Sequence, residues 1–199
     1  MRQVIRAAVV LAVCGWVLGS GSRVAAQRAG GGERMEIGAN YSFVHTNAPP
    51  GSCGCFSMNG GAGWFAFDFA HGMGFAGEVG SVQASDIDGT TAGLTITSYL
   101  AGPRYSRRLG RLFTPFAQIL LGGAHADGDL TFVRFGVAKP ANSFALAAGG
   151  GLDIGLTRHW AVRAAQVDYF LTRFSNGVND HQNNLRFSAG VVYRFGARK

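Results

Sequence analysis

The sequence predicts an all-β fold, an eight-stranded antiparallel transmembrane β-barrel in which up-and-down connections join neighbouring strands. Three observations favour it: segments of alternating polarity, a composition poor in charge, and connections that alternate between long and short. The clearest segment is 185–195, where apolar or aromatic side chains occupy every second position from Leu185 to Phe195. Period two indicates an extended strand with two unlike faces. A strand of about this length suits the wall of a membrane barrel.

Seven further segments alternate in the same way. They are 34–45, 60–69, 75–83, 94–105, 113–124, 143–154 and 160–172. The segment 94–105 is ambiguous in register, and we assign Arg104 to its inward face, with Tyr99 and Tyr105 outward.

The parity of the segment 160–172 breaks in its middle. Arg163 lies on odd parity, whereas Gln166 and Asp168 lie on even parity. A β-bulge near Ala164 and Ala165 would return all three polar side chains to one face.

The connections between these segments support a membrane barrel independently of the alternation. Long connections span 46–59, 84–93, 125–142 and 173–184, and the shorter ones lie around 70–74, 106–112 and 155–159. Long loops at one end and tight turns at the other are typical of outer-membrane barrels, whose termini lie at the short-turn, periplasmic end. We therefore expect both termini in the periplasm.

The composition points to the same location. Charged residues make up 15% of the chain, against roughly 25% in typical soluble domains, and only two lysines occur. Soluble β-proteins commonly protect their edges with lysine. The chain is 47% hydrophobic, yet it has no apolar run after its start that could form a spanning helix. This combination favours the outer membrane of a Gram-negative bacterium.

The first 26 residues read as a secretory signal peptide. Arg2 and Arg6 flank an apolar run that ends in small residues before Gln27. Residues 27–33 then form a mobile mature N-terminus, 34–195 the barrel and 196–199 a C-terminal tail. Loss of the leader removes three arginines and lowers the formal charge from +7 to +4. No basic stripe with interleaved aromatic residues remains, which argues against nucleic-acid binding.

The polar face of the segments carries charges of both signs. Its acidic and basic positions nearly cancel: Glu36, Asp68, Glu78, Asp153 and Asp168 against Arg104, Arg163, Arg186 and Arg194. An eight-stranded barrel is just wide enough for side chains, and charges buried there must pair. The set predicts a salt-bridged, plugged lumen. The alternative is a periplasmic lipocalin-like barrel with the apolar face inside, but the small, crowded polar face favours lipid outside.

Several motifs resemble those of the small outer membrane β-barrel domain proteins of Gram-negative bacteria, related to the membrane domain of OmpA and to OmpX. They lie at 99–105 (YLAGPRY), 115–118 (PFAQ), 149–153 (GGGLD), 163–169 (RAAQVDY) and 190–195 (GVVYRF). The resemblance implies outer membrane lipids or lipopolysaccharide and the barrel-assembly machinery as partners. It also assigns Tyr193 and Phe195 a lipid-facing, assembly-related role. Unlike most such barrels, the chain continues beyond the terminal phenylalanine.

Two local motifs suggest other chemistry. Cys53 and Cys55 are the only cysteines after the leader, and the oxidising envelope favours a disulfide between them. With His45 and Met58 nearby, they could instead bind a soft metal such as Cu(I).

Catalysis would require a histidine beside a serine or a carboxylate. His125-Ala126-Asp127 and Asp180-His181 are candidates, with Ser143 or Ser175 near them in space. Polar loops collect such residues by default, so we expect no enzyme, no cofactor and no metal.

Together these observations predict a monomeric outer-membrane barrel with a structural or surface-interaction role. Its long loops, particularly 46–59 and 125–142, would meet the partner. The alternatives are a narrow porin for small solutes and, less favoured, a lipid-modifying enzyme.

Overall fold

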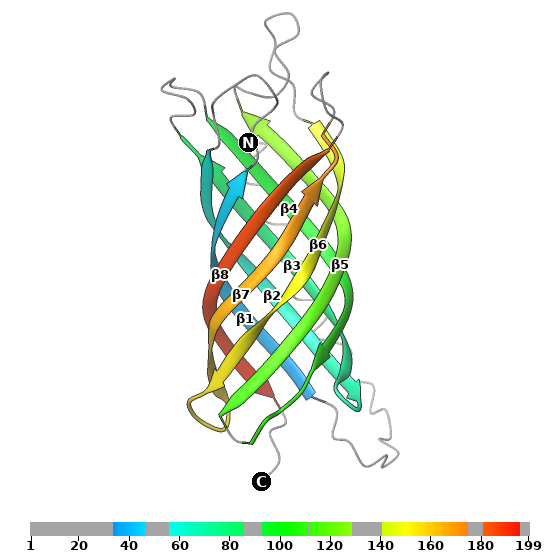
Figure 1. Cartoon of the computed structure of the whole chain (residues 1–199), viewed down its shortest axis with the longest axis vertical. Coiled ribbons are helices and arrows are strands. Elements are labelled where there is room, and N and C mark those ends of the chain that lie inside the picture. Colours follow the sequence, from blue (N-terminus) through cyan, green and yellow to red (C-terminus); the bar gives the residue numbers. More distant parts are fainter. Residues whose placement is uncertain are drawn as a thin grey trace, which may run out of the picture. The chain divides into compact units, whose positions relative to one another are not determined.

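The computed structural model describes residues 34–46, 56–85, 93–110, 112–128, 141–174 and 181–195. These residues form eight strands in one closed antiparallel barrel with the order β1 to β8 (Figure 1). The strands are β1 (Arg34–Thr46), β2 (Ser57–Ala70), β3 (Met73–Ala84), β4 (Leu94–Ser106), β5 (Phe113–Gly128), β6 (Ala141–Gly155), β7 (Trp160–Thr172) and β8 (Gln182–Phe195). The predicted fold class is confirmed.

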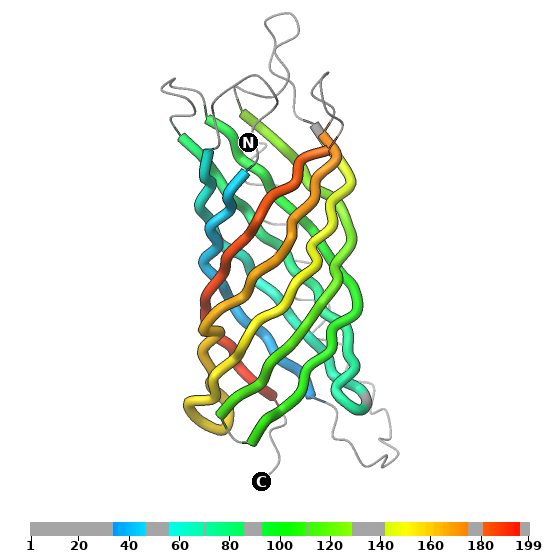
Figure 2. The backbone as a smooth tube through the Cα atoms, in the orientation of Figure 1, coloured from blue at the N-terminus to red at the C-terminus, as the bar shows by residue number. Residues whose placement is uncertain are grey.

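Each strand pairs with its neighbours in sequence, and β1 closes the barrel against β8. The closing register runs from Met35 opposite Phe195 to Thr46 opposite Asn184. The strands tilt strongly against the barrel axis, as closure of a sheet requires (Figure 2). Within the described residues, no helix is long and apolar enough to cross a membrane.

The predicted bulge in β7 is present. Arg163 pairs with Gly190 and Gln166 pairs with Ser188, so that two residues of β7 oppose one residue of β8. The extra residue restores the inward parity, and Arg163, Gln166 and Asp168 are all buried. The bulge therefore keeps three polar side chains on one face of a strand whose sequence changes parity.

Some predicted strand ends were wrong. β5 continues to Gly128 and β6 begins at Ala141, so both ends of the segment predicted as the connection 125–142, residues 125–128 and 141–142, are strand. Likewise β2 begins at Ser57, inside the predicted connection 46–59. The alternating pattern did not predict these strand ends, because the outward positions there carry polar side chains such as His125 and Asn142. The backbones of β5 and β6 pair at these positions without apolar side chains.

Short connections join β2 to β3, β4 to β5 and β6 to β7 at one end of the barrel, which we call the short-turn end. His71 and Gly72 connect β2 to β3 with φ values of 50° and 84°, the left-handed pair that a two-residue hairpin turn demands. The first residue of β1 and the last residue of β8 also lie at this short-turn end.

The two faces of the wall differ sharply. Large apolar and aromatic side chains point outward along every strand, among them Ile37, Phe65, Tyr99, Ile119 and Leu185. Arg104 is buried while Tyr99 and Tyr105 are exposed, so the register assigned to β4 is correct. An apolar exterior around a buried polar set is the reverse of a water-soluble barrel.

Candidate functional site: the barrel interior

A continuous chain of hydrogen-bonded charges runs through the barrel interior from near the short turns to about the middle. It begins where Arg194 of β8 donates from Nε to Oε1 of Glu36 at 2.9 Å. Nη2 of Arg104 lies 3.4 Å from Glu36 and 3.4 Å from Asp153, and so links β1 to β6. Asp153 then accepts two hydrogen bonds from Arg163, at 2.8 and 3.2 Å.

The chain continues toward the middle of the barrel through one neutral side chain. Arg163 donates to Oε1 of Gln166 at 2.8 Å, and Nε2 of Gln166 donates to Asp168 at 2.7 Å. Arg186 donates from Nη2 to Asp168 at 2.7 Å and from Nη1 to Glu78 at 2.5 Å. Four carboxylates and four guanidiniums, all buried, are thereby joined into a network with no net charge.

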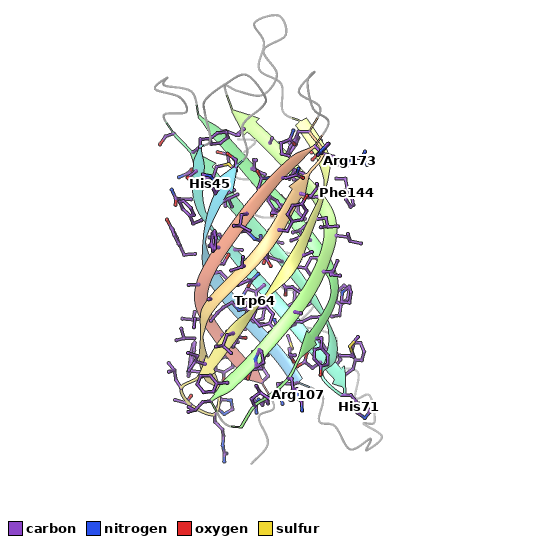
Figure 3. The ribbon with its side chains drawn as sticks, in the orientation of Figure 1. His45, Trp64, His71, Arg107, Phe144 and Arg173 are labelled. Carbon is purple, nitrogen blue, oxygen red and sulfur yellow. The ribbon has the colours of Figure 1, made fainter. Side chains whose placement is uncertain are left out.

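Two aromatic rings pack against the two arginines at the centre of this network, Arg104 and Arg163. The guanidinium carbon of Arg163 lies 3.9 Å from the ring centroid of Trp64 and 4.2 Å from that of Phe116. Arg104 contacts the same rings at 5.1 and 4.2 Å. The rings screen the two like charges from water and contribute cation–π attraction, about 2 kcal/mol or more when the site is desolvated. In Figure 3, Trp64 lies near mid-height in the barrel.

Glycines on neighbouring strands make room for these rings. A Cβ added at Gly38 would lie 2.6 Å from the indole of Trp64, and one added at Gly151 would lie 2.9 Å from the ring of Phe116. The indole nitrogen of Trp64 donates to Asn40 at 2.9 Å. The glycines of β1 and β6 are therefore part of the same arrangement.

The half of the lumen nearest the long connections has different contents. Many inward positions there carry apolar side chains that belong to one buried cluster, including Val44, Met58, Val82, Ile96, Phe170 and Phe174. The buried polar side chains among them are uncharged: Thr46, Ser98, Thr172 and Asn184. Arg186 and Asp168, which face each other in register across β8 and β7, mark its lower border, and the described inward positions beyond them carry no charge. Phe174 follows β7 and packs into the cluster, where Gln182 accepts a hydrogen bond from its backbone nitrogen at 3.0 Å.

A small cavity lies where the two halves meet. Its volume is about 10 Å³, and Ser42, Ile96, Phe170 and Arg186 are among the residues that line it. This is close to the space that one water molecule needs.

The structure places eight of the nine predicted charged positions in the network and leaves one outside it. Asp68 is half-buried near the short-turn end of β2 and accepts a hydrogen bond from Ser106 at 2.9 Å. It forms no ion pair with a described residue. The alternation of β2 correctly predicted that the Asp68 side chain points inward. Asp68 lies near the end of the strand, however, and is not within ion-pair distance of the arginines of the network.

Tyr193 and Phe195 lie on the outer wall at the short-turn rim. Their rings meet edge to face at 4.8 Å, and Trp160 meets Tyr193 in the same way at 5.0 Å. Such amphipathic rings suit the boundary between headgroups and acyl chains.

The other predicted sites are tested only in part. Nδ1 of His125 lies 2.7 Å from Asn142, and Ser143 donates to the carbonyl of Phe144. His125 and Ser143 therefore have other partners in the described residues. Cys53, Cys55, Ser175, Asp180 and residues 1–33 and 196–199 lie outside the described residues.

A closed eight-stranded meander with an apolar exterior and a buried polar interior defines a small membrane barrel of the outer-membrane class. The chain belongs to the outer membrane protein beta-barrel domain family, whose family model matches residues 14–195. The family places it in the outer membrane of a Gram-negative bacterium.

Solved structures of similar fold come from several bacteria. Ail, the attachment invasion locus protein of Yersinia pestis, is 19% identical over 82% of this chain and 99% of its own, with a TM-score of 0.53. Neisserial surface protein A is 16% identical over 83% and 100%, with a TM-score of 0.62. OprG from Pseudomonas aeruginosa is 16% identical over 81% and 95%, with a TM-score of 0.52. At such identities the likeness concerns the fold alone. No relative is found among curated protein sequences.

Proposed function

We propose that the protein is a closed, non-enzymatic outer-membrane barrel that acts through its long connections at the cell surface. The observation that carries this proposal is the lining of the interior, where a neutral ion-pair network and a largely apolar section follow one another along the barrel. A permeating ion would have to break buried ion pairs, at several kcal/mol each, and then cross an apolar section. Two barriers in series support a lumen that does not conduct.

The closed ladder supports a monomer as well. Because β1 pairs with β8 from Met35 to Thr46 and so closes the barrel, no edge strand is left to recruit a second copy. Outer membrane lipids or lipopolysaccharide and the barrel-assembly machinery are the proposed partners. Both termini are proposed to lie in the periplasm, since β1 begins and β8 ends at the short-turn end.

The surface partner is proposed to carry little charge. The long connections 47–56, 85–93, 129–140 and 173–181 contain four acidic and three basic residues: Asp86, Asp88, Asp129 and Asp180 against Arg134, Lys139 and Arg173. One structure of Ail holds the heparin analogue sucrose octasulfate. The mixed charge of the connections in this chain does not favour such a polyanion.

Planar-bilayer recording tests whether the lumen is closed. We expect no reproducible single-channel steps from the refolded protein in bilayers where a general porin conducts. Regular steps from the unchanged protein would contradict the proposal and favour the narrow porin.

Four serine substitutions then separate the two barriers. Arg104→Ser with Arg163→Ser opens the charged half, and Met58→Ser with Phe170→Ser opens the apolar half. Because the barriers lie in series, we expect steps only when all four are combined. Heat-modifiability on a gel verifies that each variant forms a barrel. Conduction by either double variant would show that one half alone closes the lumen.

A further inference from the structure

The exposed charge at the short-turn end is one-sided. Arg107, Arg108 and Arg158 are exposed in the connections β4–β5 and β6–β7, and Arg107 lies at this end of the barrel in Figure 3. The two connections, 107–112 and 156–159, contain no acidic residue. The long connections, by contrast, carry both signs. The connections at the two ends of the barrel therefore differ in the charges that they carry.

Backbone hydrogen bonds hold the two arginine-bearing connections side by side. The nitrogen of Gly155 donates to the carbonyl of Leu112 at 2.7 Å, which joins the start of one connection to the end of the other. On the far side, the nitrogen of Arg194 donates to the carbonyl of His159 at 2.8 Å, and Nδ1 of His159 lies 3.0 Å from the Arg194 carbonyl. The cations are thus carried on connections anchored to the barrel.

Exposed apolar side chains flank these arginines. Leu109 and Leu112 are 50% and 56% exposed, and Leu156 is 65% exposed. Trp160, half-exposed, follows directly and contacts Tyr193. Leucine and tryptophan beside arginine are typical of segments that enter the boundary between lipid headgroups and acyl chains.

None of Arg107, Arg108 and Arg158 forms an ion pair with a residue that the structure describes. Partial burial, followed by the positive charges of Arg34 and Arg194, lowers the pKa of Arg108 from its usual value, and the nearby acids Glu36 and Asp68 oppose this shift only in part. Crowded, unpaired cations attract an external anion.

We propose that this surface binds the phosphate groups of anionic glycerophospholipids in the leaflet that surrounds the short-turn end. We call it the arginine rim and define it by Arg107, Arg108, Arg158, Leu109, Leu112, Leu156 and Trp160. The guanidinium fork matches two phosphate oxygens, while the leucines and the tryptophan enter the acyl boundary. The arginine rim is independent of the lumen, so it stands whether or not the barrel conducts.

Spin-labelled lipids measure this selectivity in bilayers of phosphatidylcholine that contain the full mature chain. We expect labelled phosphatidylglycerol to associate about fivefold more strongly than labelled phosphatidylcholine, the factor that one arginine contributes near an anionic surface. In about 1 M salt, where the Debye length is about 3 Å, the preference should fall toward one. Equal association of the two lipids at low salt would overturn the proposal.

Two variants with the same loss of charge test where the lipid binds. In one, Arg107, Arg108 and Arg158 are all changed to Gln, and the preference should disappear. In the matched control, Arg134→Gln, Lys139→Gln and Arg173→Gln remove three charges from the long connections, and the preference should persist.

Heat-modifiability on a gel verifies that both triple variants are folded. The single change Arg158→Gln should lower the preference for phosphatidylglycerol in a barrel that is otherwise unchanged. A preference that survives the triple change in the arginine rim would overturn the proposal. A loss that is equal in the control would do so too, because it would show an effect of net charge alone.

Discussion

The two halves of the lumen are lined by different chemistry on the same strands, ion pairs toward the short turns and largely apolar side chains toward the long connections. Toward the short turns, inward positions carry Glu36, Arg104, Asp153 and Arg163, linked by ion pairs and covered by aromatic rings. Toward the long connections, the same strands turn Val44, Ile96 and Ala145 inward. The interior of this barrel is thus lined in two ways, by buried ion pairs and by apolar side chains.

The two halves should therefore differ in which substitutions of their buried side chains they tolerate. An ion pair requires its partner at a defined distance and direction, and it leaves a costly buried charge when the partner is lost. Apolar packing requires only volume and adapts to conservative exchange. The charged half should therefore be sensitive to the chemical identity of each side chain, and the apolar half to side-chain size.

The largest effect is expected from Asp153→Ala in the charged half. Asp153 accepts hydrogen bonds from Arg163 and lies 3.4 Å from Arg104, so its loss leaves two buried guanidiniums without that carboxylate. We expect the free energy of unfolding to fall by about 4 kcal/mol. Guanidinium-chloride unfolding of the barrel in detergent micelles measures it.

Asp127→Ala is the matched control for this change. Asp127 is exposed near the end of β5, and its loss should change the stability by less than about 0.5 kcal/mol. If the two substitutions cost the same, the ion-pair network would not be the element that distinguishes the charged half.

A smaller loss is expected from Phe170→Ala in the apolar half. Phe170 is 2% exposed, and its removal would leave a cavity beside the small one already present. We expect a loss of about 3 kcal/mol, measured by the same unfolding experiment.

Phe170→Leu sharpens the comparison, because it keeps most of the volume and should cost less than about 1.5 kcal/mol. A conservative exchange in the charged half, Asp153→Asn, keeps the shape but loses the charge, and should cost more than Phe170→Leu. The reverse order would contradict the distinction between sensitivity to chemical identity and sensitivity to size.

The fold was predictable because it rests on a period that one sequence displays. Alternation separated the two faces, and the parity of Arg163 and Asp168 even revealed the bulge between them. Strand ends were less predictable, since β5 and β6 continue through polar outward positions such as His125 and Asn142. These residues pair through backbone hydrogen bonds, which do not require apolar side chains and therefore cannot be recognised from the hydrophobic pattern.

The pairing inside the lumen could not be predicted in the same way. Parity turns Glu36 inward but does not say that it meets Arg194 of β8 and Arg104 of β4. Those contacts depend on the tilt of the strands and the stagger of the barrel, which bring together residues far apart in sequence. The role of Gly38 was hidden for the same reason, because only the structure shows that it faces Trp64.

The smallest effect is expected at the border between the two halves. The hydroxyls of Ser42 and Ser188 lie 2.9 Å apart and are buried, and Ser42 also lines the cavity beside Arg186. Ser188→Ala leaves the hydroxyl of Ser42 without this partner and should lower the free energy of unfolding by about 1 kcal/mol. Removal of both hydroxyls, by Ser42→Ala and Ser188→Ala together, leaves no unpaired group and should cost no more than the single change. If the double variant instead loses the sum of two single losses, the two hydroxyls would contribute separately and would not act as a pair. A double variant as stable as the unchanged protein would assign the border to the apolar half, where volume rather than polarity decides.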